Sequence, residues 1–313
     1  MATGITTYSD LTPAVREAYQ RVTLDYAKKD LVYMQFAEKA IIDKRNGDRW
    51  LARRYNPYPV ITSPDTDGVI GAPRKPTYTD ISVELDYYSD YTKITKRTQY
   101  TNLEDATLNI SQLHGTQAGE SADTLMRNVL YSGASYLNAS NGVNGDATAT
   151  EATYADFQTA VKLLRNNSAK MIKSAGVGSP NSNTSPTSQS YICFFHTDLR
   201  DDIRALDTFV PVHQYGATRG SYNMEFGCVD DICFIETNNG YLSGGYYSLF
   251  IIGMNAFSGV NLSGETLNVY RKGFGSAGTA DPTSAFATVA WDMMWGGIVQ
   301  NDSWMTNLRV SHS

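Results

Sequence analysis

The stretch ADPTSAFATVAWDMMWGGIVQNDSWMTNLRV (residues 280–310) holds three of the four tryptophans of the chain. Val289, Trp291 and Met293 alternate in it with smaller or more polar residues, which is the period of a β-strand that buries one face. No set of side chains in this stretch resembles a catalytic group. It therefore predicts mostly strand, with a large, rigid, apolar surface and no visible active site.

The composition predicts an ordinary globular chain with a sizeable core. Of the 313 residues, 42% are hydrophobic and 19% are charged, which suits one large domain or two modest ones. The formal net charge of −6 argues against a protein that grips nucleic-acid phosphates over a broad surface. We expect no signal peptide and no membrane partner, because the first residues lack a leader pattern and no run of about 18 apolar residues occurs.

Residues 48–95 predict a long two-stranded arm with an irregular tip. DRWLARRY (48–55) and YTDISVELDYYSDYTKIT (78–95) resemble strands, and five of the ten prolines lie between them. Proline removes a backbone donor, so this connection cannot be the interior of a regular sheet. Because a lone hairpin is only marginally stable, we expect it to lie against something large.

The remaining segments alternate between helix and strand without a regular βαβ repeat, which predicts an α+β fold. We expect helices over 11–42, over 102–131 with Asn102 as its cap, and from about 156 to 173. Gly115 and Gly119 share a face of the 102–131 helix, and a neighbouring backbone that approaches closely would explain them. Residues 132–152 and 174–190 are predicted loops, and the predicted strands are YICFF (191–195), GCVDDICFIET (227–237) and YYSLFIIGMNAF (246–257).

His196, Asp198, Asp201 and Asp202 form the densest group of residues that could carry chemistry. A metal or catalytic cluster is one interpretation. Helix capping is the other, because Asp198 stands where a helix over TDLRDDIRALDTF (197–209) would begin.

The three cysteines are Cys193, Cys228 and Cys233. Their odd number predicts reduced, buried thiols. A zinc site would need a fourth ligand at a recognisable spacing, and none is visible. We therefore assign no catalytic, cofactor-binding or metal-ligating residue, and no cofactor.

Four strings together resemble the major capsid proteins of tailed bacteriophages, and the likeness is strongest to the short-tailed branch. In chain order they are FFHTDLRDDIRAL (194–206), GCVDDICFIET (227–237), FIIGMNAF (250–257) and ADPTSAFATVAWDMMWGGIVQNDSWM (280–305). The resemblance extends from the region of Tyr8 to about Arg309 and departs from the family in the polar 174–190 loop. It implies the Hong Kong 97-like coat fold, with an N-terminal arm, an extended β-hairpin loop, a long spine helix and an axial domain.

The resemblance gives each segment an expected role. These are an N-terminal arm (1–47), an extended loop (48–95), a peripheral domain with the spine helix (96–184), an axial domain (185–255), and a return to the peripheral domain with the C-terminal strand (256–313). Trp291 and Trp295 are then expected in the core of one subunit, whereas the place of Trp304 stays open.

The implied function is structural and not enzymatic. Copies of the chain would form the hexamers and pentamers of an icosahedral head around double-stranded DNA. The implied partners are a separate scaffolding protein, a portal protein, a decoration protein and weakly contacted DNA, with assembly in the cytoplasm of a host bacterium. Two alternatives remain: another virion protein, such as a glycan-binding tail or fibre, and a metal-dependent hydrolase built around His196.

Overall fold

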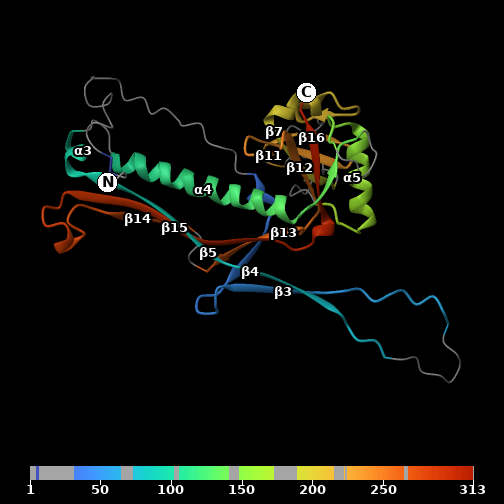
Figure 1. Ribbon diagram of the computed structural model, residues 1–313, viewed down its shortest axis with the longest axis horizontal. Helices are drawn as coiled ribbons and strands as arrows, with labels where there is room; N and C mark the ends of the chain where they lie inside the picture. The colour runs from blue at the N-terminus through green and yellow to red at the C-terminus, as the bar shows by residue number, and fades with distance from the viewer. Residues whose placement is uncertain are drawn as a thin grey trace, which may run out of the picture.

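The computed structural model describes residues 5–6, 32–64, 73–101, 106–140, 148–172, 189–214, 222, 224–263 and 267–312. They form an elongated body, a rounder unit at one end of it, and a hairpin that projects away from both (Figure 1). Helix α4 (Ala106–Gly133) runs along the elongated body. None of the described helices combines the length and the apolar composition needed to cross a lipid bilayer.

The elongated body contains a six-stranded sheet with β15 at its centre. β15 pairs antiparallel with β5 on one side, and with β14 and β13 on the other. The spatial order is β1 (Ile5–Thr6), β5 (Asp86–Thr95), β15 (Phe286–Val299), β13 (Phe257–Leu262) and β2 (Glu38–Ile42), with β14 (Asn268–Lys272) beside β15.

Helix α4 covers one face of this sheet, and the tryptophans of β15 lie beneath it. Trp291 and Trp295 are buried, as predicted, and so are the alternating Val289 and Met293. Trp291 Nε1 donates to Gln117 Oε1 of α4 over 3.1 Å. Trp304 is half-buried and packs against both large apolar cores.

The rounder unit is built on an eight-stranded mixed sheet. β7 is buried along almost its whole length, as the YICFF string predicts, because α5 (Tyr154–Asn166) packs on one face and the elongated body on the other. The spatial order is β6 (Ser135–Asn138), β16 (Met305–Ser311), β12 (Tyr246–Ile252), β7 (Tyr191–His196), β10 (Ile232–Thr237), β9 (Glu225–Val229) and β8 (Val210–Pro211), with β11 (Tyr241–Ser243) beside β12.

Short helical turns connect these strands. They are α2 (Tyr33–Phe36), α3 (Lys96–Thr101), η1 (Thr197–Leu199), α6 (Arg200–Arg204), η2 (Val212–Gln214), η3 (Gly278–Ala280) and η4 (Asp302–Trp304).

The predicted hairpin is present but shorter than expected. β3 (Arg49–Tyr55) and β4 (Tyr78–Glu84) pair antiparallel, from Arg49 opposite Glu84 to Tyr55 opposite Tyr78. The single strand predicted over 78–95 is wrong, because the chain is interrupted at Leu85 and continues as β5 in the large sheet. Leu85 is buried at this point, together with Ile42 and Val260, so the base of the hairpin is anchored in the rest of the same chain.

Other secondary-structure predictions also need correction. The helix expected from about 156 to 173 ends at Asn166, and the strand expected over 246–257 is interrupted between β12 and β13. Residues 38–42 were expected in a helix but form β2, since their backbone pairs in parallel with β13. The loop predicted over 132–152 contains β6, which pairs with β16. Of the other predicted segments, 11–31, the Asn102 cap and most of 174–190 lie outside the described residues.

The close backbone approach expected at Gly115 is also wrong. A Cβ atom built at Gly115 would meet no heavy atom within 4 Å, whereas one at Gly133, at the end of the same helix, would lie 2.5 Å from Val299 Cγ2. The two glycines therefore have opposite environments.

Gly115→Ala should raise the free energy of unfolding by about 0.5–1 kcal/mol, because alanine is the better helix former and the space is open. Gly133→Ala is the matched control and should lower it, since the new methyl group overlaps Val299. Urea unfolding of both variants tests this pair. A loss of stability in Gly115→Ala would contradict the described environment of the helix.

Candidate subunit interface

The hairpin, here residues 49–64 and 73–84, exposes many large apolar side chains. Val60 is 86% exposed and Ile61 is 72% exposed. Others that are exposed on the same hairpin are Leu51, Tyr55, Tyr58 and Tyr78. An apolar group of this size on a projecting element typically marks an interaction surface.

Polar pairs hold the two strands of the hairpin together without covering that surface. Arg53 donates to both carboxylate oxygens of Asp80, at 2.7 and 3.1 Å, and its guanidinium lies 3.9 Å from the centre of the Tyr78 ring. The hydrogen bond from Arg53 lowers the pKa of Asp80. Arg49 donates to Ser82 Oγ over 2.7 Å. The hairpin is thus held in shape by exposed cross-strand contacts while its apolar side chains face solvent.

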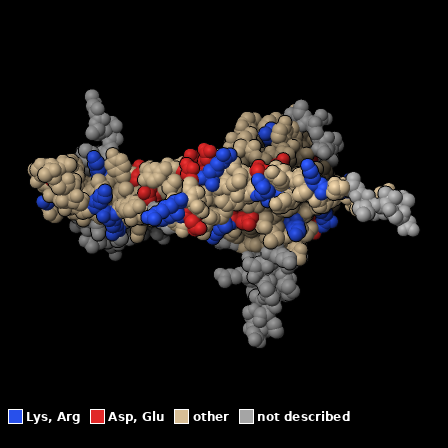
Figure 2. All heavy atoms as spheres, turned by 90° about the horizontal axis from the view of Figure 1, so that it is seen from below, with Lys and Arg blue, Asp and Glu red and all other residues tan. Residues whose placement is uncertain are grey.

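A second exposed surface lies on the face of the β5–β15–β14 sheet that α4 does not cover. It carries Tyr87, Tyr91 and Tyr270 around a hollow of about 470 Å³. Tyr87 donates to Asp292 Oδ2 over 3.0 Å, and this hydrogen bond raises the pKa of Tyr87. Figure 2, seen from below, shows basic and acidic side chains interspersed on this side of the molecule, with no broad area of one sign. The surface is therefore partly apolar, through its exposed tyrosines, and partly polar.

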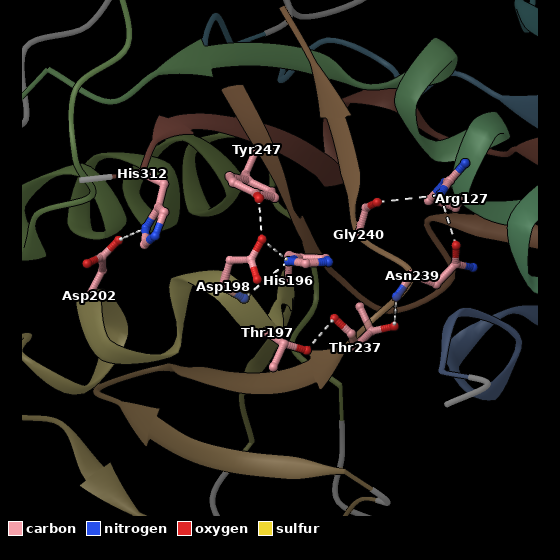
Figure 3. A network of polar contacts seen from close by, with 10 residues as sticks. All are labelled: Arg127, His196, Thr197, Asp198, Asp202, Thr237, Asn239, Gly240, Tyr247 and His312. Carbon is pink, nitrogen blue, oxygen red and sulfur yellow. Dashed lines mark hydrogen bonds and ion pairs between the residues drawn. The ribbon is translucent and has the colours of Figure 1, made fainter. Parts of the chain in front are cut away.

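A buried carboxylate joins three parts of the chain. Asp123 of α4 accepts from the backbone N–H of Tyr33 over 2.9 Å, and from Asn239 Nδ2 over 3.2 Å. Arg127, one turn further along α4, donates to Asn239 Oδ1 over 2.8 Å and to the Gly240 carbonyl over 3.4 Å (Figure 3). The segment around Tyr33, the long helix and the turn after β10 are therefore fixed to one another. Burial raises the pKa of Asp123.

The His196 group does not form one site. Asp198 accepts from Tyr247 and also faces His196, whereas Asp202 faces His312 and Asp201 is exposed (Figure 3). Asp198 was expected to cap the helix that begins here, and this prediction is wrong. The cap is His196, whose Nδ1 accepts from the Asp198 backbone N–H over 3.1 Å at the start of η1. The hydrogen bond from Tyr247 lowers the pKa of Asp198.

The prediction of reduced thiols is wrong for two of the three cysteines. Cys228 and Cys233 form a disulfide, because the short β9–β10 hairpin places them directly opposite each other. Cys193 is a free, buried thiol, and burial raises its pKa. Sequence reasoning missed three residues whose partners lie far along the chain or depend on a turn: Asp123, Tyr247 and Glu225.

Neither protein-family models nor curated proteins match this sequence. Solved structures do match. The capsid of Ralstonia phage GP4 is 11% identical with a TM-score of 0.63, over 100% of this chain and 99% of that chain. The capsid of cyanophage P-SCSP1u is 11% identical with a TM-score of 0.64, and the match covers 95% of this chain and 93% of that chain. The SrpI encapsulin of Synechococcus elongatus is 11% identical with a TM-score of 0.61, and the match again covers 95% of this chain and 93% of that chain.

The chain has the Hong Kong 97 coat fold. The α+β prediction from the order of helices and strands is confirmed, and so is the coat fold that the resemblance implied. These structural similarities do not show whether the chain is closest to the short-tailed branch of phages, so that part of the resemblance stays a prediction. In the Hong Kong 97 fold of this chain, the long helix is α4, and the hairpin is the element that reaches furthest from the rest of the described residues (Figure 1).

The buried Asp123 predicts a specific pH dependence. Since its pKa is raised on folding, the folded chain holds the proton more tightly than the unfolded chain does. Its contribution to stability is therefore fully present below the unfolded pKa of about 3.9, and is lost as the pH rises through the folded value. Asp123→Asn cannot titrate, so the unfolding free energy of the wild type minus that of Asp123→Asn should fall with rising pH.

Urea unfolding of both proteins at a series of weakly acidic to neutral pH values measures this difference. Asp80→Asn is the control: the pKa of exposed Asp80 is lowered, so its small contribution is lost only below a pH of about 3.9, and its difference from the wild type should stay level over this pH range. A difference for Asp123→Asn that stays level or rises with pH would show that burial does not dominate at this carboxylate.

Proposed function

We propose that the chain is a major capsid protein whose copies assemble into the hexamers and pentamers of an icosahedral phage head enclosing double-stranded DNA. The observation that carries the proposal is the exposed apolar hairpin on a subunit with the Hong Kong 97 coat fold. The function is structural and requires no catalytic residue.

The hairpin favours contact with another subunit because its large apolar side chains are exposed in the described part of the chain. Val60 and Ile61 are largely solvated, whereas Leu85 at the base is buried. Burying one such side chain contributes roughly 1.5–3 kcal/mol before entropic costs. Repeating the same contact around a ring of copies multiplies this gain, and heterologous contacts of this kind close when the rotation allows.

We propose a separate role in the shell for each segment of the chain. These are an N-terminal arm (1–47), an extended loop over the neighbouring subunit (48–95), a peripheral domain (96–184), an axial domain at the centres of the rings (185–255), and a return to the peripheral domain (256–313). The structure supports one adjustment within this proposal: β5 pairs with β15, so the loop itself ends near Glu84.

The net charge of −6 is compatible with enclosing DNA without adhering to it over a broad surface. We propose a separate scaffolding protein, a portal protein and a decoration protein as partners, with assembly in the cytoplasm of the host bacterium and the virion as the final location.

A second candidate is a shell of the encapsulin kind, since the SrpI encapsulin shares the fold over 95% of this chain. The two candidates differ in contents and not in the architecture of the subunit. The material found inside purified particles therefore distinguishes them.

Expression of the chain alone and with candidate scaffolding proteins, followed by negative-stain microscopy and a nuclease-protection assay, tests the function. Closed shells of uniform size, with protected DNA when packaging components are present, are expected. Particles that exclude nucleic acid and copurify with another protein would favour the second candidate. A chain that stays monomeric under every assembly condition would overturn both.

Replacing the exposed apolar pair at the hairpin tests the proposed interface. Val60→Ser combined with Ile61→Ser should change the unfolding free energy of the monomer by less than about 0.5 kcal/mol, because neither side chain is buried there. The yield of shells should fall by about tenfold or more, since burial against a neighbour is lost.

Sedimentation of assembly mixtures measures that yield. Thr62→Ala, a polar and exposed neighbour on the same segment, is the matched control and should assemble normally. Wild-type yields from the double variant would place the subunit contact elsewhere.

A further inference from the structure

Two cysteines and one carboxylate converge on the β9–β10 hairpin. Cys228 and Cys233 lie opposite each other with their Cα atoms 4.1 Å apart, and Glu225 Oε1 lies 3.6 Å from Cys228 Sγ. The donor atoms of all three residues lie within 4.8 Å of one another. Among the described residues, no other group of three or more His, Cys, Asp and Glu side chains brings its donor atoms this close together.

Cys193 does not take part, although it is on the neighbouring strand. In the parallel pair β7–β10, Ile192 pairs with Cys233 and Cys193 pairs with Phe234. Because successive side chains point to opposite faces of a sheet, Cys193 and Cys233 face opposite ways. They accordingly belong to different apolar cores. The third ligand of the group is a carboxylate and not the third thiol.

We propose that Glu225, Cys228 and Cys233 form a two-state site: a disulfide in the oxidised chain, and a site for one thiophilic divalent cation of the Zn²⁺ class in the reduced chain. Two thiolates and a carboxylate are ligands that Zn²⁺ takes in tetrahedral sites, with the fourth position left for water. Opposed residues of an antiparallel pair are close enough to bridge directly or through one ion.

The carboxylate is held in place independently of the sulfur atoms. Glu225 Oε2 accepts from the backbone N–H of Tyr222 over 3.1 Å, which leaves Oε1 on the side of Cys228. The Tyr222 ring is packed against Phe36, with the ring centres 5.1 Å apart. This contact restrains Tyr222, whose backbone N–H in turn holds Glu225 in position.

The change of state is a thiol–disulfide exchange with a small thiol reductant. A reductant thiolate attacks Sγ of half-buried Cys228, the sulfur–sulfur bond breaks, and the buried Cys233 sulfur leaves with the electron pair and takes up a proton. A second reductant thiol displaces the first from Cys228. The products are two cysteine thiols and one reductant disulfide, and binding of the cation then releases the two thiol protons.

Cobalt is the probe for this site, because thiolate ligands give Co²⁺ an intense near-ultraviolet charge-transfer band. Full-length protein is reduced with a phosphine, which is then removed without oxygen, and Co²⁺ is titrated in. We expect a band that saturates at one ion per reduced chain and disappears when Zn²⁺ is added. The oxidised chain should give no band. Absence of the band in the reduced wild type would overturn the proposal.

Three variants locate the ligands. Cys228→Ser should abolish the band, Glu225→Gln should weaken Co²⁺ binding about 10-fold or more, and Cys193→Ser should leave it unchanged. Circular dichroism confirms that each variant is folded. Loss of the band in Cys193→Ser, or its persistence in Cys228→Ser, would overturn the assignment, and wild-type affinity in Glu225→Gln would remove Glu225 from the site.

A measurement on the reduced wild type covers the case in which Cys228→Ser fails to fold. Zn²⁺ should slow the alkylation of Cys228 by iodoacetamide, as located by mass spectrometry of peptides. Equal rates with and without Zn²⁺ would overturn the proposal without any variant.

Discussion

The packing of α4 against β15 is the contact on which the rest of the elongated body depends. The helix buries Met126 and Leu130 on the side where β15 presents Trp291 and Trp295. Gln117 adds the polar part of the contact, because it accepts from Trp291 and donates to Asp90 of β5 over 2.7 Å. One glutamine thus connects the helix with two neighbouring strands, which fixes the position of the helix along the sheet as well as its distance from it.

This rigid body explains how a thin hairpin can be held away from it. Its base is buried through Leu85, and a Cβ atom added at Gly296 of β15 would lie 3.0 Å from the Glu84 carbonyl, so the two elements touch directly. Beyond the base, cross-strand contacts such as Arg53–Asp80 maintain the shape. The chain therefore combines a fixed point of attachment with an apolar surface that is exposed among the described residues.

The order of apolar and polar residues within a segment was enough to predict those strands that can be recognised from their own sequence. The alternation around Trp291 predicted β15, and the continuous apolar run of YICFF predicted the buried β7. Residues 38–42 were misassigned because the apolar spacing of Ile41 and Ile42 fits a helix as well as a strand, and only pairing with β13, more than 200 residues later, decides between them.

The candidate sites likewise depend on contacts between distant segments or on a turn, which the local sequence does not reveal. The disulfide depends on the tight turn that sets Cys228 opposite Cys233, and spacing alone does not reveal that register. Asp123 looked like an ordinary helix residue because its partners, Tyr33 and Asn239, are about 90 and 116 positions away in the chain. The end of regular β3–β4 pairing at Tyr55 and Tyr78 could be predicted from the prolines between them, whereas the anchoring of the hairpin base at Leu85 required the tertiary structure.

The position of the two latest strands has a consequence for biosynthesis. β15 is the central strand of one sheet, and β16 lies between β6 and β12 in the other. Until the ribosome has released these strands, β5 lacks its partner on one side, β6 lacks the strand with which it pairs, and the tryptophan-rich face of the first sheet does not exist. Such distant pairing slows folding and leaves unsatisfied strand edges on the nascent chain. Folding of both sheets is thus postponed until β15 and β16 have been translated, and a chaperone could protect the unpaired strand edges during this period.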